Sequence, residues 1–302
     1  MNRIDTLSPL SKTIGEAAGS LIHYMELTKP RLTLLAVLTT LLGFYMGSWL
    51  VVDLPLLLVT MVGAALVGFG ANALNQYLER ETDAKMKRTQ NRPLPTGRLQ
   101  PEQALFFGII LSVAGILVLA FFVNLLTSLL AVITLTTYLF VYTPLKKRSP
   151  LCTLAGAIPG AIPPLIGWTA VRGELGLEAW ILFSILFLWQ LPHFLAIGWV
   201  CREEYARAGF PMLMVLDSNG KSTTRQILLY CLALLPVTLI PSILRMSGIV
   251  YFGAVLFLGA ILAGLSLFLC LTKEKDFHAR KFFLTTILYL FVLIIFMMSD
   301  KI

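Results

Sequence analysis

Long apolar stretches separated by polar segments dominate the chain. A helix needs about 20 apolar residues to cross roughly 30 Å of hydrocarbon, and nine stretches come close to that length. They run approximately over residues 32–52, 54–74, 104–122, 125–142, 151–170, 179–200, 226–244, 248–271 and 282–298. The pattern therefore predicts an all-α integral membrane protein with nine transmembrane helices.

The composition excludes an ordinary water-soluble domain. Hydrophobic residues make up 57% of the 302 residues and charged residues only 13%, so a soluble fold would leave large apolar surfaces in water. No domain-sized polar segment interrupts the apolar stretches, which predicts one membrane domain over residues 31–302. Residues 1–30 are expected to form a cytoplasmic N-terminal segment, and they lack the apolar core and cleavage site of a signal peptide.

Lysine and arginine residues are divided unequally between the two sides of the predicted bundle. With nine spans, alternate loops face opposite sides, and the side that includes the N-terminus holds 21 of the 24 basic residues. The other side holds Arg172, Arg245 and Lys301. Because basic loops stay in the cytoplasm, we expect the N-terminus in the cytoplasm and the C-terminus outside. This bias explains most of the net charge of +8. The basic charge therefore does not indicate a nucleic acid as a partner.

Three polar residues at the end of the second apolar stretch are spaced four residues apart: Asn75, Glu79 and Asp83. On a helix, this spacing places an amide and two carboxylates on one face over about 12 Å. Oxygen ligands of this kind suit Mg²⁺, which commonly links carboxylates to substrate phosphates. The first charged loop, residues 75–103, is therefore expected to hold a magnesium site.

Basic residues in the same loop supply charge for phosphate oxygens. The candidates are Arg80, Lys87, Arg88 and Arg92. The alternative is a solvated helix end with ordinary charge pairs between residues four apart. Asn75 and Glu79 argue against it, because they continue an apolar span at a depth where polar groups without partners are costly.

A second polar segment, YTPLKKR, ends the fourth apolar stretch. Tyr142 and Lys146 are four residues apart and Lys147 follows directly, and all three are candidates for binding a diphosphate. The alternative is a cationic helix end beside an interfacial aromatic residue, which would account for this segment taken alone.

The sixth apolar stretch and the loop after it contain a third group of polar residues. Gln190, Pro192 and His193 are expected to interrupt the helix within the membrane, and Glu204 emerges at its cytoplasmic end. Trp189, Gln190 and His193 are candidates for contact with a second substrate. For His193 the alternative is a hydrogen bond to another helix. The two charged loops are predicted on the same side of the membrane, where they would form one active site for a diphosphate-bearing substrate.

These motifs resemble those of the UbiA superfamily of intramembrane prenyltransferases, and within it the protohaem IX farnesyltransferase (haem O synthase) family. Asn75, Glu79 and Asp83 match the NxxxDxxxD-like motif of the superfamily, and Tyr142 and Lys146 match its YxxxK motif. The family is indicated by the longer strings ERETDAKMKRTQNRPLPTG, GAIPPLIGW, WQLPHF and EEYARAGFPML. The resemblance extends from about residue 29 to residue 298.

The chain departs from the superfamily pattern at two points. Glu79 stands where the superfamily usually has Asp, which adds one methylene of reach and keeps the ligand chemistry. The second superfamily motif is typically DxxxD, and only Glu204 matches it here, with Val200 and Ala208 four residues to either side. A second metal site is thus incomplete in the sequence, with Asp217 as a candidate from its position alone.

The resemblance implies nine helices around a central cavity with cytoplasmic polar caps, in the inner (plasma) membrane of a bacterium. It implies a Mg²⁺-dependent transferase that converts haem b, farnesyl diphosphate and water to haem O and diphosphate, with haem b as a substrate rather than a cofactor. Asn75, Glu79, Asp83 and Glu204 would hold the metal, and Lys146 would join the first motif in catalysis. The lipid bilayer and haem A synthase or assembly factors of terminal oxidases are the implied partners.

Three alternatives remain open at this point. A prenyltransferase of a quinone precursor or another aromatic acceptor would share the superfamily motifs, but WQLPHF argues against it. A transporter of a lipid or phosphate compound would place polar groups near the midplane, whereas the acidic residues here gather at one face. A structural protein of oxidase assembly would leave Asn75, Glu79 and Asp83 without a role.

Overall fold

Helices make up most of the computed structural model, which describes residues 21–49 and 51–302. The predicted N-terminal segment lies mostly outside these residues, and its last part, residues 21–28, is helical. Nine helical segments in the described part are long and apolar enough to cross a membrane, and each coincides with one predicted stretch. The prediction of an all-α membrane protein with nine transmembrane helices is confirmed.

Most of the spans are single helices. Seven are α2 (Pro30–Gly47), α3 (Leu54–Asp83), α4 (Pro101–Phe122), α9 (Leu177–Val200), α12 (Lys221–Ile243), α13 (Ile249–Leu271) and α14 (Lys275–Ser299). The fourth span joins α5 (Leu125–Thr136), the π-helix η1 (Thr137–Tyr142) and α6 (Thr143–Lys146), and the fifth joins α7 (Cys152–Ala161) to α8 (Pro163–Arg172). Two short helices, α10 (Arg202–Arg207) and α11 (Leu213–Leu216), lie in the loop after α9.

Side-chain caps define the start of two spans. Asp53 accepts a hydrogen bond from the amide of Leu56 at 3.0 Å at the start of α3, and Asn124 accepts one from the amide of Thr127 at 2.8 Å at the start of α5. These caps satisfy amides of the first turn that have no partner within the helix. Because lipid tails offer no hydrogen bonds, such caps matter where a helix enters the bilayer.

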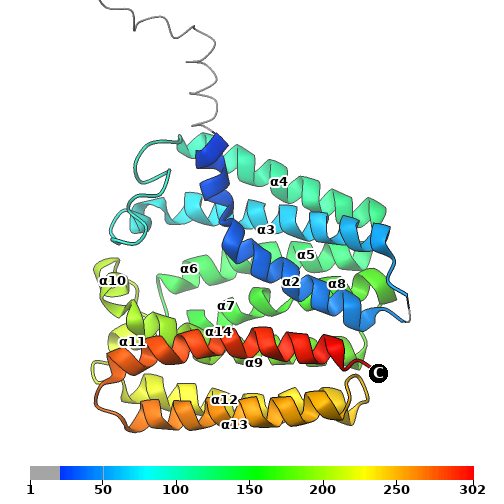
Figure 1. The fold of residues 1–302 in the computed structure, drawn as a ribbon. Coiled ribbons are helices and arrows are strands. Elements are labelled where there is room, and N and C mark those ends of the chain that lie inside the picture. The colour runs from blue at the N-terminus through cyan, green and yellow to red at the C-terminus, as the bar shows by residue number, and fades with distance from the viewer. Residues whose placement is uncertain (1–20, 50) are drawn as a thin grey trace, which may run out of the picture.

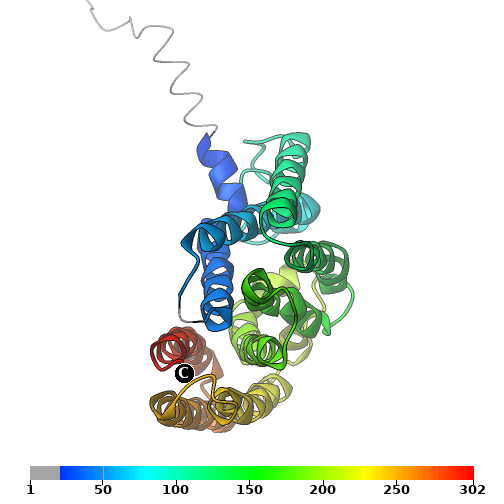
Figure 2. The same ribbon diagram turned by 90° about the vertical axis from the view of Figure 1, so that its right-hand side faces the viewer.

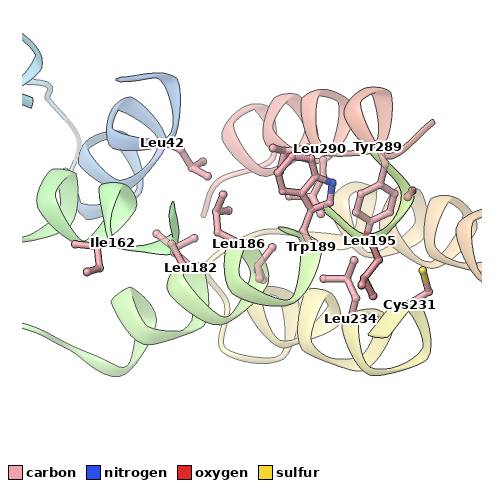
Figure 3. Packing of buried hydrophobic residues seen from close by; sticks show 14 of the residues in the cluster. Leu42, Ile162, Leu182, Leu186, Trp189, Leu195, Cys231, Leu234, Tyr289 and Leu290 are labelled. Atoms are coloured by element: carbon pink, nitrogen blue, oxygen red, sulfur yellow. The ribbon is translucent and has the colours of Figure 1, made fainter. Parts of the chain in front are cut away.

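The spans run along a common direction, and the longest loops gather at one end of the bundle (Figure 1). Seen from the opposite end, the chain runs once around the bundle, so that α14 returns next to α2 (Figure 2). Helix α9 packs against α7, α8, α12 and α14 and is more than half buried. Its residues Leu182, Leu186 and Trp189 belong to the same buried cluster as Leu42 of α2 and Leu290 of α14 (Figure 3).

Helices α2 and α8 approach each other so closely that only glycine fits at the contact. A Cβ atom on Gly43 would collide with the carbonyl oxygen of Pro164, and one on Gly167 with the carbonyl oxygen of Thr40. Small residues allow membrane helices to pack backbone against backbone in this way. The contact lies in the half of α2 that is remote from the long loops, and it fixes that half against α8.

The outer surface of the bundle is apolar. Leu58, Ile110, Phe257 and Leu288 are each more than 60% exposed. Such exposure suits a surface in contact with lipid tails, where an apolar side chain is not penalised. The chain is therefore a multi-pass membrane protein.

Candidate active site

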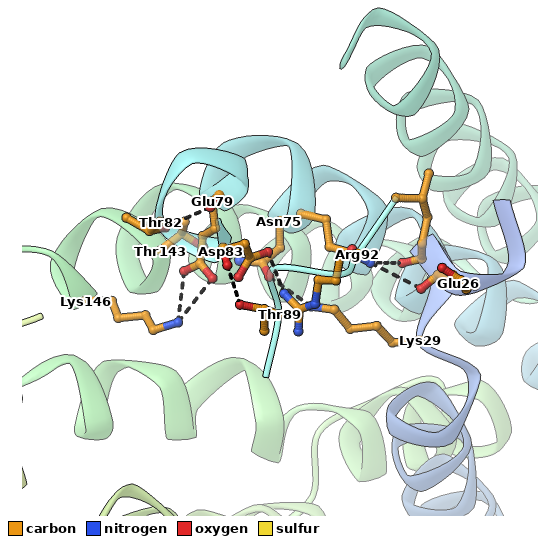
Figure 4. Close-up of polar contacts among 12 residues, drawn as sticks. Glu26, Lys29, Asn75, Glu79, Thr82, Asp83, Thr89, Arg92, Thr143 and Lys146 are labelled. Carbon is orange, nitrogen blue, oxygen red and sulfur yellow. Dashed lines mark hydrogen bonds and ion pairs between the residues drawn. The ribbon is translucent and has the colours of Figure 1, made fainter. Parts of the chain in front are cut away.

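The polar end of α3 is buried in the protein. The helix continues through Asp83, and Asn75, Glu79 and Asp83 lie on one face of it, each no more than 3% exposed (Figure 4). The spacing of four residues thus produces the geometry that the sequence predicts. Side chains this deeply buried do not belong to a solvated helix end, which was the alternative for this motif.

Each of these three residues has a cationic partner from a different part of the chain. The Lys146 ammonium at the end of α6 lies 3.2 Å and 3.1 Å from the two carboxylate oxygens of Glu79. The Arg92 guanidinium donates to Asp83 Oδ2 at 2.6 Å, and Lys29 Nζ donates to Asn75 Oδ1 at 3.2 Å. Buried carboxylates are stable in this environment only when a cation or hydrogen bond compensates them, so the three cations belong to the site.

Asp83 holds an oxygen atom that has no such partner. Its Oδ1 atom is buried and accepts no hydrogen bond from the described residues. The loop after α3 folds back over the carboxylate, because Thr89 donates to the Asp83 carbonyl at 2.8 Å and Arg92 reaches Oδ2. An orphaned carboxylate oxygen beside an amide and a second carboxylate fits a hard cation. Within residues 21–49 and 51–302, no cluster of three His, Cys, Asp or Glu residues could hold a metal, so a cation here would need further oxygen ligands, such as the Asn75 amide, a substrate phosphate or water.

The loop after α9 meets the loop after α3. Glu204 Oε2 accepts a hydrogen bond from the Arg88 amide at 3.1 Å, and its Oε1 atom lies 3.5 Å from Arg207. The Lys146 ammonium lies 4.6 Å from the ring centre of Phe210 and 5.9 Å from that of Tyr205. Segments more than 100 residues apart thus form one polar site with an aromatic wall.

The remaining basic candidates lie farther out. Arg80 donates to the Tyr77 carbonyl at 2.8 Å and pairs with the exposed Glu81 at 3.8 Å. Lys87 and Lys147 are exposed on the surface. Among the predicted basic residues, only Arg92 and Lys146 pair with the buried carboxylates of Asp83 and Glu79. Asp217, the other candidate from the second loop, accepts a hydrogen bond from the Thr223 amide at 2.7 Å in the first turn of α12.

Tyr142 lies in the π-helical segment η1, directly before α6. Its ring stacks on that of Tyr138 with the centres 5.6 Å apart, and it packs against Gly156 of α7. The Thr143 hydroxyl accepts a hydrogen bond from the Asn75 amide at 3.2 Å. A π-helix changes the direction of following side chains and is common at functional sites, and here it brings η1 and α6 against α3.

The expected break in the sixth span does not occur. Helix α9 continues through Pro192 from Leu177 to Val200. Proline leaves a carbonyl without its usual amide partner, but one missing hydrogen bond is tolerated where neighbouring helices pack closely. The Gln190 amide donates to the carbonyls of Leu186 and Ala157, at 3.1 Å and 3.4 Å, so this polar residue links α9 to α7 without interrupting the helix.

His193 and Trp189 connect α9 to α14. His193 Nδ1 lies 2.8 Å from the Thr286 hydroxyl, and Trp189 Nε1 donates to the Thr286 carbonyl at 2.7 Å. The imidazole packs between the rings of Trp189 and Phe283, with both ring centres at 4.8 Å. The hydrogen bond between helices that the alternative proposes is present, and contact of His193 with an acceptor stays a prediction.

Lys29 is the main residue of this site that sequence reasoning missed. It precedes α2 in a left-handed conformation, with φ 45° and ψ 62°. Burial, and after it the nearby Arg92 guanidinium, lower the pKa of its ammonium to about 7. In the sequence, a lysine at the start of the first span resembles the basic residues that flank membrane helices on the cytoplasmic side. Only its position beside the polar end of α3 in the structure marks it as a residue of the site. Tyr205 and Phe210 were missed because aromatic residues are common in such chains.

Comparison with known proteins gives a consistent assignment. The UbiA prenyltransferase family matches residues 36–293. The protoheme IX farnesyltransferase of Solibacter usitatus is 46% identical over 289 residues, which cover 92% of this chain and 98% of that protein. The protoheme IX farnesyltransferase of Koribacter versatilis is 42% identical over 303 residues, which cover 97% of this chain and 97% of that protein.

Solved structures share the fold. A digeranylgeranylglyceryl phosphate synthase superposes with a TM-score of 0.79 at 20% identity, covering 93% of this chain and 98% of that one. A UbiA homologue from Archaeoglobus fulgidus, bound to GPP and Mg²⁺, gives a TM-score of 0.65 at 14% identity and covers 92% of this chain and 99% of that one.

Proposed function

This chain belongs to the UbiA prenyltransferase family, and we propose that it transfers the farnesyl group of farnesyl diphosphate to protohaem IX. Relatives of 42% to 46% identity that match almost the whole chain carry the name of this activity. The observation that carries the proposal within the structure is the buried ladder of Asn75, Glu79 and Asp83, in which each residue faces a cation. A structural assembly protein has no need of such a costly arrangement.

The reaction breaks the C–O bond between C1 of the farnesyl chain and the diphosphate. The terminal carbon of a haem vinyl group forms a new C–C bond to C1, and the inner vinyl carbon becomes electron-deficient. Water adds there and releases a proton, which leaves a hydroxyethylfarnesyl side chain and free diphosphate. The main tasks of the protein are to stabilise charge on the departing diphosphate and to keep water away until the C–C bond has formed.

The residues at the end of α3 fit a magnesium ion. Asn75, Glu79 and Asp83 offer the oxygen ligands it prefers, and Asp83 Oδ1 has no other partner among the described residues. When bound, Mg²⁺ supplies a Lewis acid that stabilises negative charge on the diphosphate. The A. fulgidus homologue bound to GPP and Mg²⁺ supports this assignment. Glu204, held against Arg88 and Arg207, lies at the edge of the site as a further candidate ligand.

Lys146, Arg92 and Lys29 bind the diphosphate in this proposal. Each already contacts an oxygen of the α3 ladder, and each comes from a different element, so the three cations surround one region. Arginine and lysine side chains form strong charge-assisted hydrogen bonds to phosphate oxygens. Lys87, Arg88 and Lys147, which are exposed, attract the anionic substrate from a greater distance.

Aromatic side chains beside the cations exclude water. Phe210 and Tyr205 cover the Lys146 ammonium, and the stacked rings of Tyr138 and Tyr142 lie on the segment directly before it. Aromatic ring faces also stabilise a neighbouring cation. They suit the allylic carbon, which becomes positive as the C–O bond breaks.

The acceptor side of the proposal is assigned to α9, where Trp189, Gln190 and His193 would line the haem. The site end of the bundle would face the cytoplasm, because the long basic loops gather there (Figure 1). Arg172, the last residue of α8, and Lys301, which follows α14, belong to the other end.

Incubation of the purified protein with haem b, farnesyl diphosphate and Mg²⁺, followed by mass analysis of the haem, tests the proposal. A haem heavier by one farnesyl group and one hydroxyl group is the expected product. In parallel, 4-hydroxybenzoate replaces haem as a representative aromatic acceptor. Prenylation of 4-hydroxybenzoate with haem unchanged would favour the quinone-precursor alternative. The absence of a prenylated product from either acceptor would contradict both the proposal and that alternative.

A further inference from the structure

Two basic residues meet at the end of the bundle opposite the candidate active site. Arg172 ends α8 and Lys301 follows α14, and both lie at the end of α2 that Figure 2 faces. The Arg172 guanidinium lies 4.0 Å from the ring centre of Trp49 and 5.5 Å from that of Trp168. Arg172 and Lys301 are two of only three basic residues that the sequence assigns to this side of the membrane.

Lys301 joins the end of α2 through backbone carbonyls. Its ammonium donates to the carbonyls of Tyr45 and Ser48, at 2.6 Å and 2.5 Å, and lies 4.8 Å from the Tyr45 ring centre. An ammonium has three N–H donors, so one remains. Burial lowers the pKa of the Lys301 ammonium, and the Arg172 guanidinium lowers it further, which places the two cations within electrostatic reach of each other.

Neither cation of this pair forms a salt bridge with the described residues. Among residues 21–49 and 51–302, no carboxylate lies within 4.0 Å of Arg172 or Lys301. Glu174 and Glu178 lie in or near the same connection, and the Asp300 carboxylate accepts a hydrogen bond from the Tyr251 amide at 2.7 Å. Two adjacent cations repel each other, and an anion bound between them would offset this repulsion.

Two donors at the same place also have no acceptor. Trp168 Nε1 is buried in a side chain that is only 5% exposed, and Arg172 Nε is buried as well, and neither has a hydrogen-bond partner in the described part of the chain. A buried donor without an acceptor is destabilising. Two of them beside two cations that form no salt bridge indicate a ligand with several acceptor oxygens and a negative charge.

We propose that Arg172, Lys301 and Trp168 form a binding site for the phosphate of an anionic phospholipid, in the leaflet opposite the active site. Arginine matches phosphate geometry with paired donors. The flanking residue Trp49 favours a lipid over a free anion, because its ring contacts Arg172, is 77% exposed and offers contact to an acyl chain. Tryptophan is enriched at this depth of the membrane.

Native mass spectrometry of the purified protein with phosphatidylglycerol tests the proposal, with phosphatidylcholine as the zwitterionic comparison. We expect preferential retention of phosphatidylglycerol, and a loss of about tenfold or more in its affinity in Arg172→Gln/Lys301→Gln. Arg245→Gln is the matched control, because it removes the third basic residue of the same side and should leave retention unchanged. Equal affinity in wild type and the double variant would overturn the proposal.

Two further measurements keep the test decisive. Trp168→Phe keeps an aromatic ring at this position and removes the unpartnered indole N–H together with the pyrrole part of the ring. It tests the site if the double variant does not fold, and we expect a several-fold weaker retention of phosphatidylglycerol. Unchanged retention in this variant would contradict the assignment of Trp168. Inorganic phosphate provides the last arm: competition at about 10 mM would identify a site for free anions and overturn the lipid assignment, whereas no competition supports it.

Discussion

Replacing Glu79 by Gln separates the chemical role of this carboxylate from its role in the fold. The substitution keeps the volume of the side chain and removes the charge that faces Lys146. The ammonium lies 3.1 Å and 3.2 Å from the two oxygens of Glu79, and the side chains are 10% and 4% exposed. Because water does not reach either group, the single substitution leaves a cation without its counter-charge in a region of low dielectric constant.

We expect Glu79→Gln to lower the free energy of unfolding by about 3–5 kcal/mol, the range for removal of one partner from a buried ion pair. Lys146→Met should cost a similar amount, because it leaves the carboxylate unpaired. The double variant should lose much less than the sum of the two, with a coupling energy of at least about 2 kcal/mol. Turnover should be absent in all three variants, since Glu79 is a proposed metal ligand and Lys146 a proposed diphosphate ligand.

Unfolding of the variants in detergent measures the coupling, and mass analysis of the haem product measures turnover. Glu81→Gln is the matched control, because it lies on the same helix with its side chain 82% exposed and a distant partner at 3.8 Å. It should change the unfolding free energy by no more than about 0.5 kcal/mol and keep turnover. Additive costs in the double variant, within about 0.5 kcal/mol, would refute the buried pair, and turnover restored in the double variant would refute the ligand roles.

Four further predictions concern other parts of the molecule. Asp83→Asn should abolish turnover in a folded protein and chelation of Mg²⁺ should reproduce the loss, whereas full turnover under thorough chelation would contradict a metal role. Lys29→Met should weaken the binding of inorganic pyrophosphate about tenfold in calorimetry. It should also remove part of the rise in unfolding free energy between about pH 7 and pH 9, because unfolded Lys29 takes up a proton that the folded residue, with a pKa of about 7, has lost. His193→Ala should weaken haem binding or alter the Soret absorbance, and an unchanged spectrum and affinity with only a lower melting temperature would leave His193 as a structural residue. Reporter fusions at Asn219 and Arg172 should report the cytoplasm and the outside respectively, and the same compartment for both would contradict the nine-span topology.

The nine spans could be predicted because lipid imposes a simple requirement on the sequence. A segment must be apolar over about 20 residues to cross the bilayer, and this requirement acts on each segment separately. The alignment of Asn75, Glu79 and Asp83 was predictable for a similar reason, since a spacing of four residues fixes one face of one helix. Both features depend on residues that are close in the chain.

Contacts between distant segments could not be predicted in the same way. The cationic partner of Asn75 is Lys29, and the aromatic ring nearest to Lys146 is that of Phe210. No spacing in the sequence relates these residues, because their meeting depends on how the loops fold back over α3. The continuous path of α9 through Pro192 is a related case, since packing against neighbouring helices rather than the local sequence decides whether a proline ends a membrane helix.

The contact between Gly43 and Pro164 holds α2 near one of its ends, so that α2 would rotate about this point if it moved as a rigid body. About 21 Å of chain separates Lys29 from Gly43 at the helical rise of 1.5 Å per residue, whereas only about 6 Å separates Gly43 from Gly47. A rocking motion about this pivot would move the Lys29 end more than three times as far as the Gly47 end. A helix held in this way can bring its lysine toward the substrate, or withdraw it, while its opposite end moves less than a third as far.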